Sequence, residues 1–320
     1  MSKKRLISLL KLIVSAGLLI IVFTQVSWVD VKSVLALANP GWLGLAMAAY
    51  FAGVFIRAVR WRLLLPQSNE PAIRLRRLVG LYFASFFFNS FLPTGIGGDV
   101  VRIGEITQAV GLPIAASSVI ADRAIGLVAS GLLALAVLPW VGGQLSWPLA
   151  LITGVVAIGL PIGFWLLTRY RPADTSLANR FPTLLRSAVN QVLEIAKALA
   201  AYPRRALVRA MLVSLAFALT NALTYAWIGA ALNIDLPLGY YILVSPVITL
   251  VLLIPVSVNG LGTRDVTYQA LFVPAGVTPE AALAMSLIYH AFNLIAAIIG
   301  GIVYAVMGMV GATASKERVS

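Results

Sequence analysis

The sequence predicts an all-α, polytopic membrane protein whose residues 1–320 form one integral membrane domain. Hydrophobic residues make up 60% of the chain and charged residues only 11%, whereas soluble domains are about half apolar and about a quarter charged. The mean hydropathy is +0.95, and several apolar runs reach the roughly 20 residues that a helix needs to cross a bilayer. Cysteine is absent and His290 is the only histidine, which excludes disulfides, thiolate metal sites and His-rich metal clusters.

Six apolar segments are long enough to be full transmembrane helices. They are residues 6–28, 42–65, 114–140, 147–168, 206–232 and 281–309. The basic start of the chain also fits a signal peptide, but no cleavage site lies close to the apolar run, which favours an uncleaved helix. Residues 169–205 are expected to form a basic cytoplasmic connector, either an amphipathic helix on the membrane surface or a plain connecting helix.

Two further apolar runs are too short to cross a bilayer, and each ends at a proline followed by a glycine-rich turn and a short return segment. We interpret them as re-entrant helical hairpins, which with the spans that follow them occupy residues 78–140 and 238–309. The eight apolar segments are therefore six full spans plus two hairpins. The turn residues expected to line a cavity are Pro93, Gly95, Gly97 and Gly98 in the first hairpin and Gly260 and Gly262 in the second.

The two hairpins share a spacing that indicates an inverted repeat. In each, a glycine lies five residues and an arginine nine residues after the proline; these are Pro93, Gly98 and Arg102, and Pro255, Gly260 and Arg264. In inverted-repeat transporters, broken helices that enter from opposite faces meet near the middle of the membrane, where irregular backbone lines a buried or water-filled cavity. Chance recurrence of glycine and proline is the alternative.

The basic residues predict the orientation in the membrane. With the N-terminus inside, residues 1–11, 57–77, 169–209 and 316–318 are cytoplasmic and hold 20 of the 24 Lys and Arg residues, as the positive-inside rule requires. Both termini are then cytoplasmic and the protein lies in the cell (inner or plasma) membrane. The net charge of +13 faces anionic lipid rather than nucleic acid, and Arg57, Arg60 and Arg62 are interpreted as anchors at the cytoplasmic surface.

Ionisable residues close to apolar segments point to a functional site. Arg102, Arg123 and Arg264 are candidates for a phosphate clamp, because guanidinium presents a planar fork of donors; the alternative is that each neutralises a neighbouring acid. Candidates for a coupling proton or for ion pairs are Asp99, Glu105, Asp122, Asp265 and His290; His290 also fits a packing role. Asn89 and Asn259 are expected to satisfy the open ends of broken helices or to contact the substrate. Asp99 and Glu105 are only a weak option for a metal ion, and we expect no metal or other cofactor.

Three blocks of the sequence read FLPTGIGGDVVRIGEI, IADRAIGL and PVSVNGLGTRDV. Together they resemble the lysylphosphatidylglycerol synthase transmembrane-region family, a flippase-like membrane domain found alone or fused to a synthase domain. The resemblance implies movement of a phospholipid or another lipid-linked polar head between leaflets. It also implies that Pro93–Arg102, Asp122 with Arg123, and Asn259–Asp265 line the cavity. Because no synthase domain follows the last span in this sequence, we expect that the chain does not itself make lysylphosphatidylglycerol.

A lipid translocase is therefore the leading hypothesis, with a membrane lipid, of anionic headgroup, as the substrate and no nucleic acid as a partner. Walker lysine loops and Gly-X-Ser-X-Gly elbows are absent, so we expect no enzyme. The alternatives are an intramembrane lipid-modifying enzyme with a carboxylate among Asp99, Glu105 and Asp122, an accessory subunit of a lipid or glycolipid synthesis system, or a scaffold. A homo-oligomer and a separate lipid-synthesis enzyme as a partner are left open.

Overall fold

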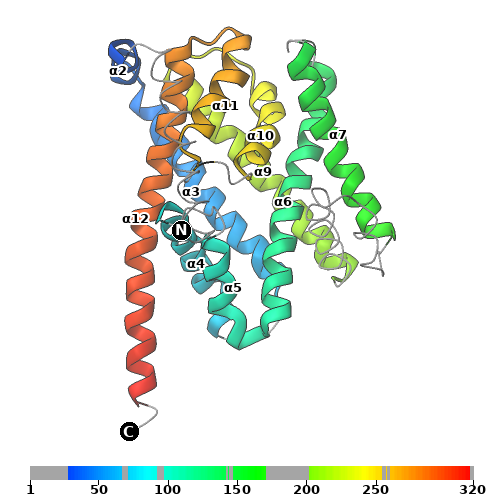
Figure 1. The fold of residues 1–320 in the computed structure, drawn as a ribbon, viewed down its shortest axis with the longest axis vertical. Coiled ribbons are helices and arrows are strands. Elements are labelled where there is room, and N and C mark those ends of the chain that lie inside the picture. Colours follow the sequence, from blue (N-terminus) through cyan, green and yellow to red (C-terminus); the bar gives the residue numbers. More distant parts are fainter. Residues whose placement is uncertain are drawn as a thin grey trace, which may run out of the picture.

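The computed structural model describes residues 28–66, 71–91, 97–141, 143, 147–170, 202–253, 257 and 260–317, and every regular element within these ranges is helical. The elements are α2 (Trp28–Ala36), α3 (Pro40–Leu63), η1 (Pro71–Ile73), α4 (Leu75–Phe91), α5 (Gly97–Val110), α6 (Leu112–Val141), α7 (Trp147–Tyr170), α9 (Arg204–Ala231), α10 (Leu238–Leu253), α11 (Thr263–Phe272), η5 (Val273–Ala275) and α12 (Pro279–Glu317). The long helices run lengthwise through the molecule (Figure 1). The all-α class is thereby confirmed.

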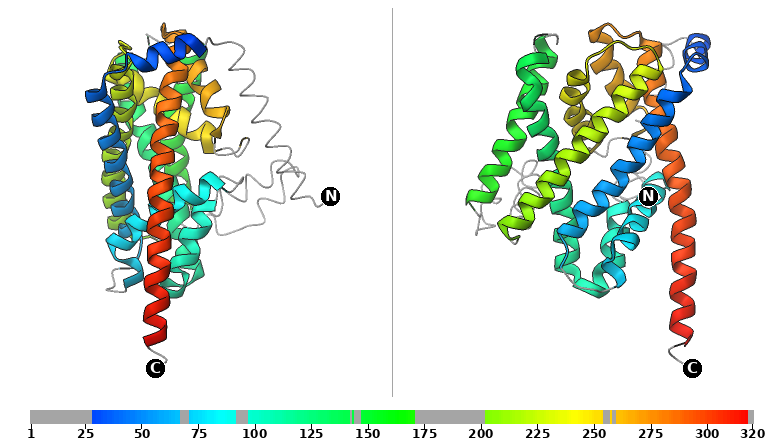
Figure 2. Two further views of the ribbon diagram at one scale, coloured as in Figure 1. Left: turned by 90° about the vertical axis from the view of Figure 1, so that its left-hand side faces the viewer. Right: turned by 180° about the vertical axis from the view of Figure 1, so that it is seen from behind.

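Five described helices, α3, α6, α7, α9 and α12, are long and apolar enough to cross a membrane, and they coincide with five of the six predicted spans. The sixth, residues 6–28, and nearly all of the connector 169–205 lie outside the described residues. One span is longer than predicted: α12 continues to Glu317 and projects beyond the other helices (Figure 2).

Besides α2, which has nine residues, four α-helices of the described chain are too short to cross a bilayer, and they form two successive pairs. Helices α4 and α5 have 17 and 14 residues, and α10 and α11 have 16 and 10, against the roughly 20 that a full crossing needs. The first pair lies in the lower half of Figure 1 and the second in the upper half. The helix–turn–helix pairs thus fall where the hairpins are predicted, although most of the turn residues lie outside the described residues.

Each pair ends in the same local way. Gly111 follows α5 with φ +80° and Gly276 follows η5 after α11 with φ +90°. Backbone of this left-handed kind terminates helices and favours glycine, which has no Cβ to clash. A new long helix, α6 or α12, begins within three residues of each glycine.

Helix α4 packs closely against both α5 and α12 because a glycine lies at each contact. A Cβ on Gly98 of α5 would lie 2.6 Å from the backbone oxygen of Ser85 in α4, and a Cβ on Gly300 of α12 would lie 1.9 Å from the backbone oxygen of Phe83. Any larger residue at either place would force the helices apart. Helix α4 is therefore held between α5 and α12 by backbone-to-backbone approach.

Large apolar side chains lie both inside and outside the bundle. Trp61, Tyr240 and Phe272 are fully buried, whereas Trp140 and Trp147 are highly exposed. Exposed tryptophans at helix ends are typical of the interface between lipid and water. The polar groups described next are set in the apolar interior.

Candidate functional site

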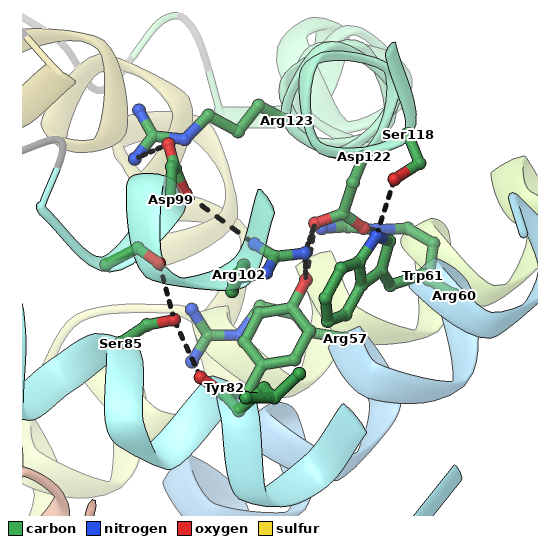
Figure 3. Close-up of polar contacts among 12 residues, drawn as sticks. Arg57, Arg60, Trp61, Tyr82, Ser85, Asp99, Arg102, Ser118, Asp122 and Arg123 are labelled. Carbon is green, nitrogen blue, oxygen red and sulfur yellow. Dashed lines mark hydrogen bonds and ion pairs between the residues drawn. The ribbon is translucent and has the colours of Figure 1, made fainter. Parts of the chain in front are cut away.

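The first polar cluster is centred on Asp122 of α6 and draws side chains from four helices (Figure 3). We call its members, Arg60, Tyr82, Asp99, Arg102, Asp122 and Arg123, the Asp122 cluster. The Asp122 carboxylate is 1% exposed. Its Oδ1 lies 2.6 Å from Arg60 Nε of α3, and its Oδ2 lies 3.0 Å from Arg102 Nη2 of α5 and accepts a hydrogen bond from the Tyr82 hydroxyl of α4. A buried carboxylate is stable only with such partners.

Asp99 extends the cluster toward the surface. Its Oδ2 lies 2.6 Å from Arg123 Nη2, and its Oδ1 lies 3.7 Å from Arg102 Nη1. The Arg123 side chain is 35% exposed, whereas that of Arg102 is 4% exposed. The structure therefore places Arg102 and Arg123 in ion pairs with acids.

Aromatic rings and a glycine surround the guanidinium groups of the cluster. The Arg102 Cζ lies 4.0 Å from the ring centroids of both Trp61 and Tyr82, a cation–π arrangement. Trp61 Nε1 donates to Ser118 Oγ at 3.0 Å. A Cβ on Gly126 would lie 2.5 Å from Arg60 Nη1, so a larger residue there would require this guanidinium to shift.

Arg60 corrects the sequence interpretation. It is not a surface anchor: the residue is 4% exposed, pairs with Asp122 and donates to Ser214 Oγ at 3.4 Å. The position of Arg60 in a run of basic residues hid this role, because the positive-inside rule already accounts for such a run. Only the burial of one face of α3 distinguishes Arg60 from Arg62, which is less buried.

The second cluster surrounds Arg264 at the start of α11, and we call Arg264, Asp265, Ser286, Tyr289 and His290 the Arg264 cluster. Arg264 is 8% exposed. Its Nη1 donates to His290 Nδ1 at 3.0 Å, and its Cζ lies 5.1 Å from the Tyr289 ring centroid. Among the described residues no carboxylate forms an ion pair with Arg264.

The neighbouring acid, Asp265, is engaged elsewhere. Its Oδ2 accepts from the backbone N–H of Gly262 at 3.1 Å, which caps α11, and its Oδ1 accepts from Ser286 Oγ at 2.5 Å. Gly260 and Gly262 both have φ +74°, a conformation that side chains disfavour. The turn glycines and Asp265 thus fix the start of the helix that carries Arg264.

A row of aromatic rings joins the two clusters. The Arg57 Cζ lies 5.5 Å from the Tyr82 centroid and 5.2 Å from the Phe86 centroid. The Tyr50 ring lies 6.0 Å from Phe86 and 5.4 Å from Tyr289, and its hydroxyl donates to Asn293 Oδ1 at 3.0 Å. Sequence reasoning missed Tyr50 and Tyr82 because aromatic residues in apolar helices are usually packing residues.

The remaining predicted residues are placed as follows. Asn89 Oδ1 accepts from the Gly98 N–H at 2.7 Å, as expected for a side chain at an open helix end; Gly97 and Gly98 begin α5. Glu105 pairs with Arg77 at 2.9 Å and accepts from the Tyr304 hydroxyl at 3.2 Å, apart from both clusters. Asn259, Pro93 and Gly95 lie outside the described residues.

Within the described ranges, no group of three or more His, Cys, Asp or Glu residues is arranged to hold a metal ion. Asp99 and Glu105 pair with different arginines. A surface cavity of about 370 Å³ is lined by Asn233, Asp235 and Thr278, among others, and none of its lining residues belongs to either cluster. The polar groups of the two clusters are therefore arginines, aspartates, one histidine and hydroxyls beside aromatic rings.

Comparison with known proteins assigns the family. The model of the family described as "Lysylphosphatidylglycerol synthase TM region" matches residues 8–301. Neither the curated proteins nor the solved structures contain a significant match. The matched range covers four of the five described spans and most of the fifth, both short helix pairs as far as they are described, and both polar clusters. The chain is a multi-pass membrane protein that belongs to the lysylphosphatidylglycerol synthase TM region family.

Proposed function

We propose that the protein is a lipid translocase that moves an anionic or polar-headed phospholipid, or another lipid-linked group, between the leaflets of the cell membrane. The family supports a role with phospholipid, since its description refers to lysylphosphatidylglycerol. The observation that carries the proposal is Arg264, a buried arginine for which the described residues supply no ion-pairing carboxylate. Charged residues in an apolar membrane interior are energetically costly and usually mark a functional site.

The buried charges are equal in number, with arginines at positions 60, 102 and 264 and aspartates at positions 99, 122 and 265. Arg57 and Arg123 are only partly buried. Of the buried arginines in the described part of the chain, Arg264 is the one without an ion-pairing carboxylate. Because burying an unpaired charge is costly, an anion that enters the bundle would be bound favourably, and the phosphate of a lipid headgroup is the anion that a bilayer supplies.

The short helix pairs provide the route in this proposal. We interpret α4–α5 and α10–α11 as re-entrant hairpins of an inverted repeat that enter from opposite faces, and support comes from their places in opposite halves of Figure 1. The basic ends of α3, α4 and α9 lie toward the end at which α12 finishes, so we assign that end to the cytoplasm. Rocking of the two halves would then expose the polar interior to each leaflet in turn.

Translocation is preferred to catalysis because the candidate carboxylates already have partners. Asp122 pairs with Arg60 and Arg102, Asp99 with Arg123, and Glu105 with Arg77. A general base needs a carboxylate that is free to accept a proton from the substrate. The proposal accordingly treats these acids as partners of arginines and requires neither a cofactor nor a metal.

Reconstitution in liposomes tests this function. Vesicles that contain the protein and a trace of fluorescent, headgroup-labelled phosphatidylglycerol are treated with a membrane-impermeant quencher. We expect the protected inner-leaflet fraction to become accessible faster than in protein-free vesicles. The matched control is Arg209→Gln, which removes an exposed arginine of α9 and should leave exchange unchanged. Exchange at the protein-free rate would reject the proposal.

A further inference from the structure

The two helix pairs carry arginines at matching places in the sequence, yet these arginines have different partners in the structure. Arg102 of the first pair lies 3.0 Å from Asp122 on the following long helix. Arg264 of the second pair meets His290 on its following long helix instead of an acid. The first arginine is neutralised by an ion pair within the protein, and the second is buried without an ion-pairing carboxylate among the described residues.

The bond between Arg264 and His290 fixes the proton on the imidazole. A guanidinium has donors and no acceptor, so His290 Nδ1 must accept the bond from Arg264 Nη1. A neutral imidazole with an unprotonated Nδ1 carries its proton on Nε2. His290 therefore presents an Nε2–H donor on the side away from Arg264 Nη1.

Two donors in this contact pair have no acceptor in the described part of the chain. They are Arg264 Nε and His290 Nε2, both of which are buried. Leaving a buried donor unsatisfied is unfavourable, and more so for a charged group. Because both atoms are donors and the pair has a net positive charge, an anion with more than one acceptor oxygen would satisfy both.

We propose that Arg264 and His290 form a binding site for a phosphate group, with the lipid phosphodiester as its intended occupant. This deepens the proposed function and rests on it for the identity of the cargo. A phosphodiester has a single negative charge, which balances the one charge of Arg264, and its oxygens can accept from both side chains. Tyr289, with its ring 5.1 Å from the Arg264 Cζ, keeps the guanidinium in position.

The proposal assigns a different role to the Asp122 cluster. That cluster has both of its carboxylates already occupied by arginines and joins α3, α4, α5 and α6. It fixes the first half of the molecule, whereas Arg264 and His290 bind the cargo. The two roles make opposite predictions for stability in the absence of lipid.

Thermal unfolding of the full chain in detergent separates these roles. We expect Arg102→Gln to lower the unfolding midpoint, because it removes a partner of Asp122. Arg264→Gln should leave the midpoint unchanged or raise it, because an uncompensated buried charge is lost. A clear loss of stability with Arg264→Gln would show that the arginine has an unrecognised structural partner, and would overturn the proposal.

Binding is measured as the rise in unfolding midpoint when short-chain phosphatidylglycerol is titrated into the detergent-purified protein. We expect wild type to be stabilised, and Arg264→Gln to bind about tenfold or more weakly, as for a lost charge-assisted hydrogen bond. Arg264→Lys, which keeps the charge without the fork, should fall between them and replaces Arg264→Gln should that variant fail to fold. His290→Ala should weaken binding, whereas His290→Gln, which retains one acceptor and one donor, should restore most of it.

Parallel titrations identify the source of the phosphate. A short-chain diglucosyl lipid without phosphate should not stabilise the protein. Inorganic phosphate that stabilises as well as phosphatidylglycerol would assign the site to free phosphate. Equal binding to wild type and to Arg264→Gln overturns the site even if lipid exchange occurs in vesicles. Binding that depends on Arg264 without exchange rejects the translocase and keeps the site.

Discussion

At the scale of single residues, the acceptor atoms of Asp122 decide where the arginines of the first half lie. The two carboxylate oxygens have different partners: Oδ1 accepts from Arg60, and Oδ2 accepts from Arg102 and Tyr82. The donors come from three different helices, so one side chain holds three helices at fixed distances from α6. Breaking a buried ion pair on one side leaves uncompensated charge, which costs about 3–5 kcal/mol.

Asp122→Asn tests this role. The amide cannot neutralise Arg60 and Arg102, so we expect the free energy of unfolding to fall by about 3–5 kcal/mol, seen as a large drop in the thermal midpoint in detergent. Asp235→Asn, at an exposed position in the loop before α10, is the matched control and should change little. A similar small effect at both positions would contradict the assignment of Asp122 as the central acceptor.

Gly126→Ala tests the space reserved for Arg60. The new Cβ would lie 2.5 Å from Arg60 Nη1, so the guanidinium must shift and weaken its contact with Asp122. We expect a loss of about 1–3 kcal/mol, typical of overpacking. Gly154→Ala in α7 meets nothing within 4 Å and should be neutral or slightly stabilising, since alanine favours helix. Equal effects of the two alanines on thermal stability would argue against a tight Arg60 site.

At the scale of elements, the short helices depend on their partners more than on their own sequence. Helix α11 has only 10 residues, too few for an isolated helix to be stable. It is kept in place by the Asp265 cap, by the bond from Ser286 and by the buried rings of Tyr268 and Phe272. In the first pair, α5 is kept in place by the Asn89 cap and by the close approach of Gly98 to α4.

Gly98→Ala is expected to disrupt the first pair. The added methyl would lie 2.6 Å from both the Cβ and the backbone oxygen of Ser85, and backbone cannot turn aside as a side chain can. We expect α5 to separate from α4, with lower thermal stability and reduced lipid exchange in vesicles. Gly104→Ala in the same helix meets nothing within 4 Å and serves as the control. Wild-type stability and exchange in Gly98→Ala would refute this view of the packing.

At the scale of the whole molecule, the distribution of charge and of apolar surface is that of a bundle surrounded by lipid. Among the described residues, Arg60, Arg102 and Arg264 are buried, while large side chains such as Trp165 and Ile302 are exposed on helices α7 and α12. The proposed orientation puts the start of α9 in the cytoplasm and its end on the other side. Helix α9 has 28 residues, enough for one full crossing.

Cysteine labelling tests this orientation directly, because the chain has no cysteine of its own. Arg205→Cys and Asp235→Cys introduce single thiols at exposed positions before and after the α9 crossing. In right-side-out spheroplasts, an impermeant maleimide should label position 235 at once and position 205 only after the membrane is opened. The reverse order would invert the topology, and labelling of both from one side would remove α9 from the set of spans.

The sequence by itself determined the fold class, five described spans and the places of both short helix pairs, because hydropathy, proline and glycine act locally along the chain. It also singled out Asp99, Arg102, Asp122 and Arg264, since charge in an apolar protein is conspicuous. It gave no means of telling Arg60 from Arg62.

Only the tertiary structure decided which charge meets which. Arg60 is 62 residues from Asp122 in the chain, and Arg264 is 26 from His290, so these pairings depend on how distant helices pack and on which face each turns inward. The tertiary structure gave Arg102 an acid and Arg264 a histidine. The energy of a buried charge is set by the groups that surround it. That difference therefore cannot be predicted from any local sequence pattern.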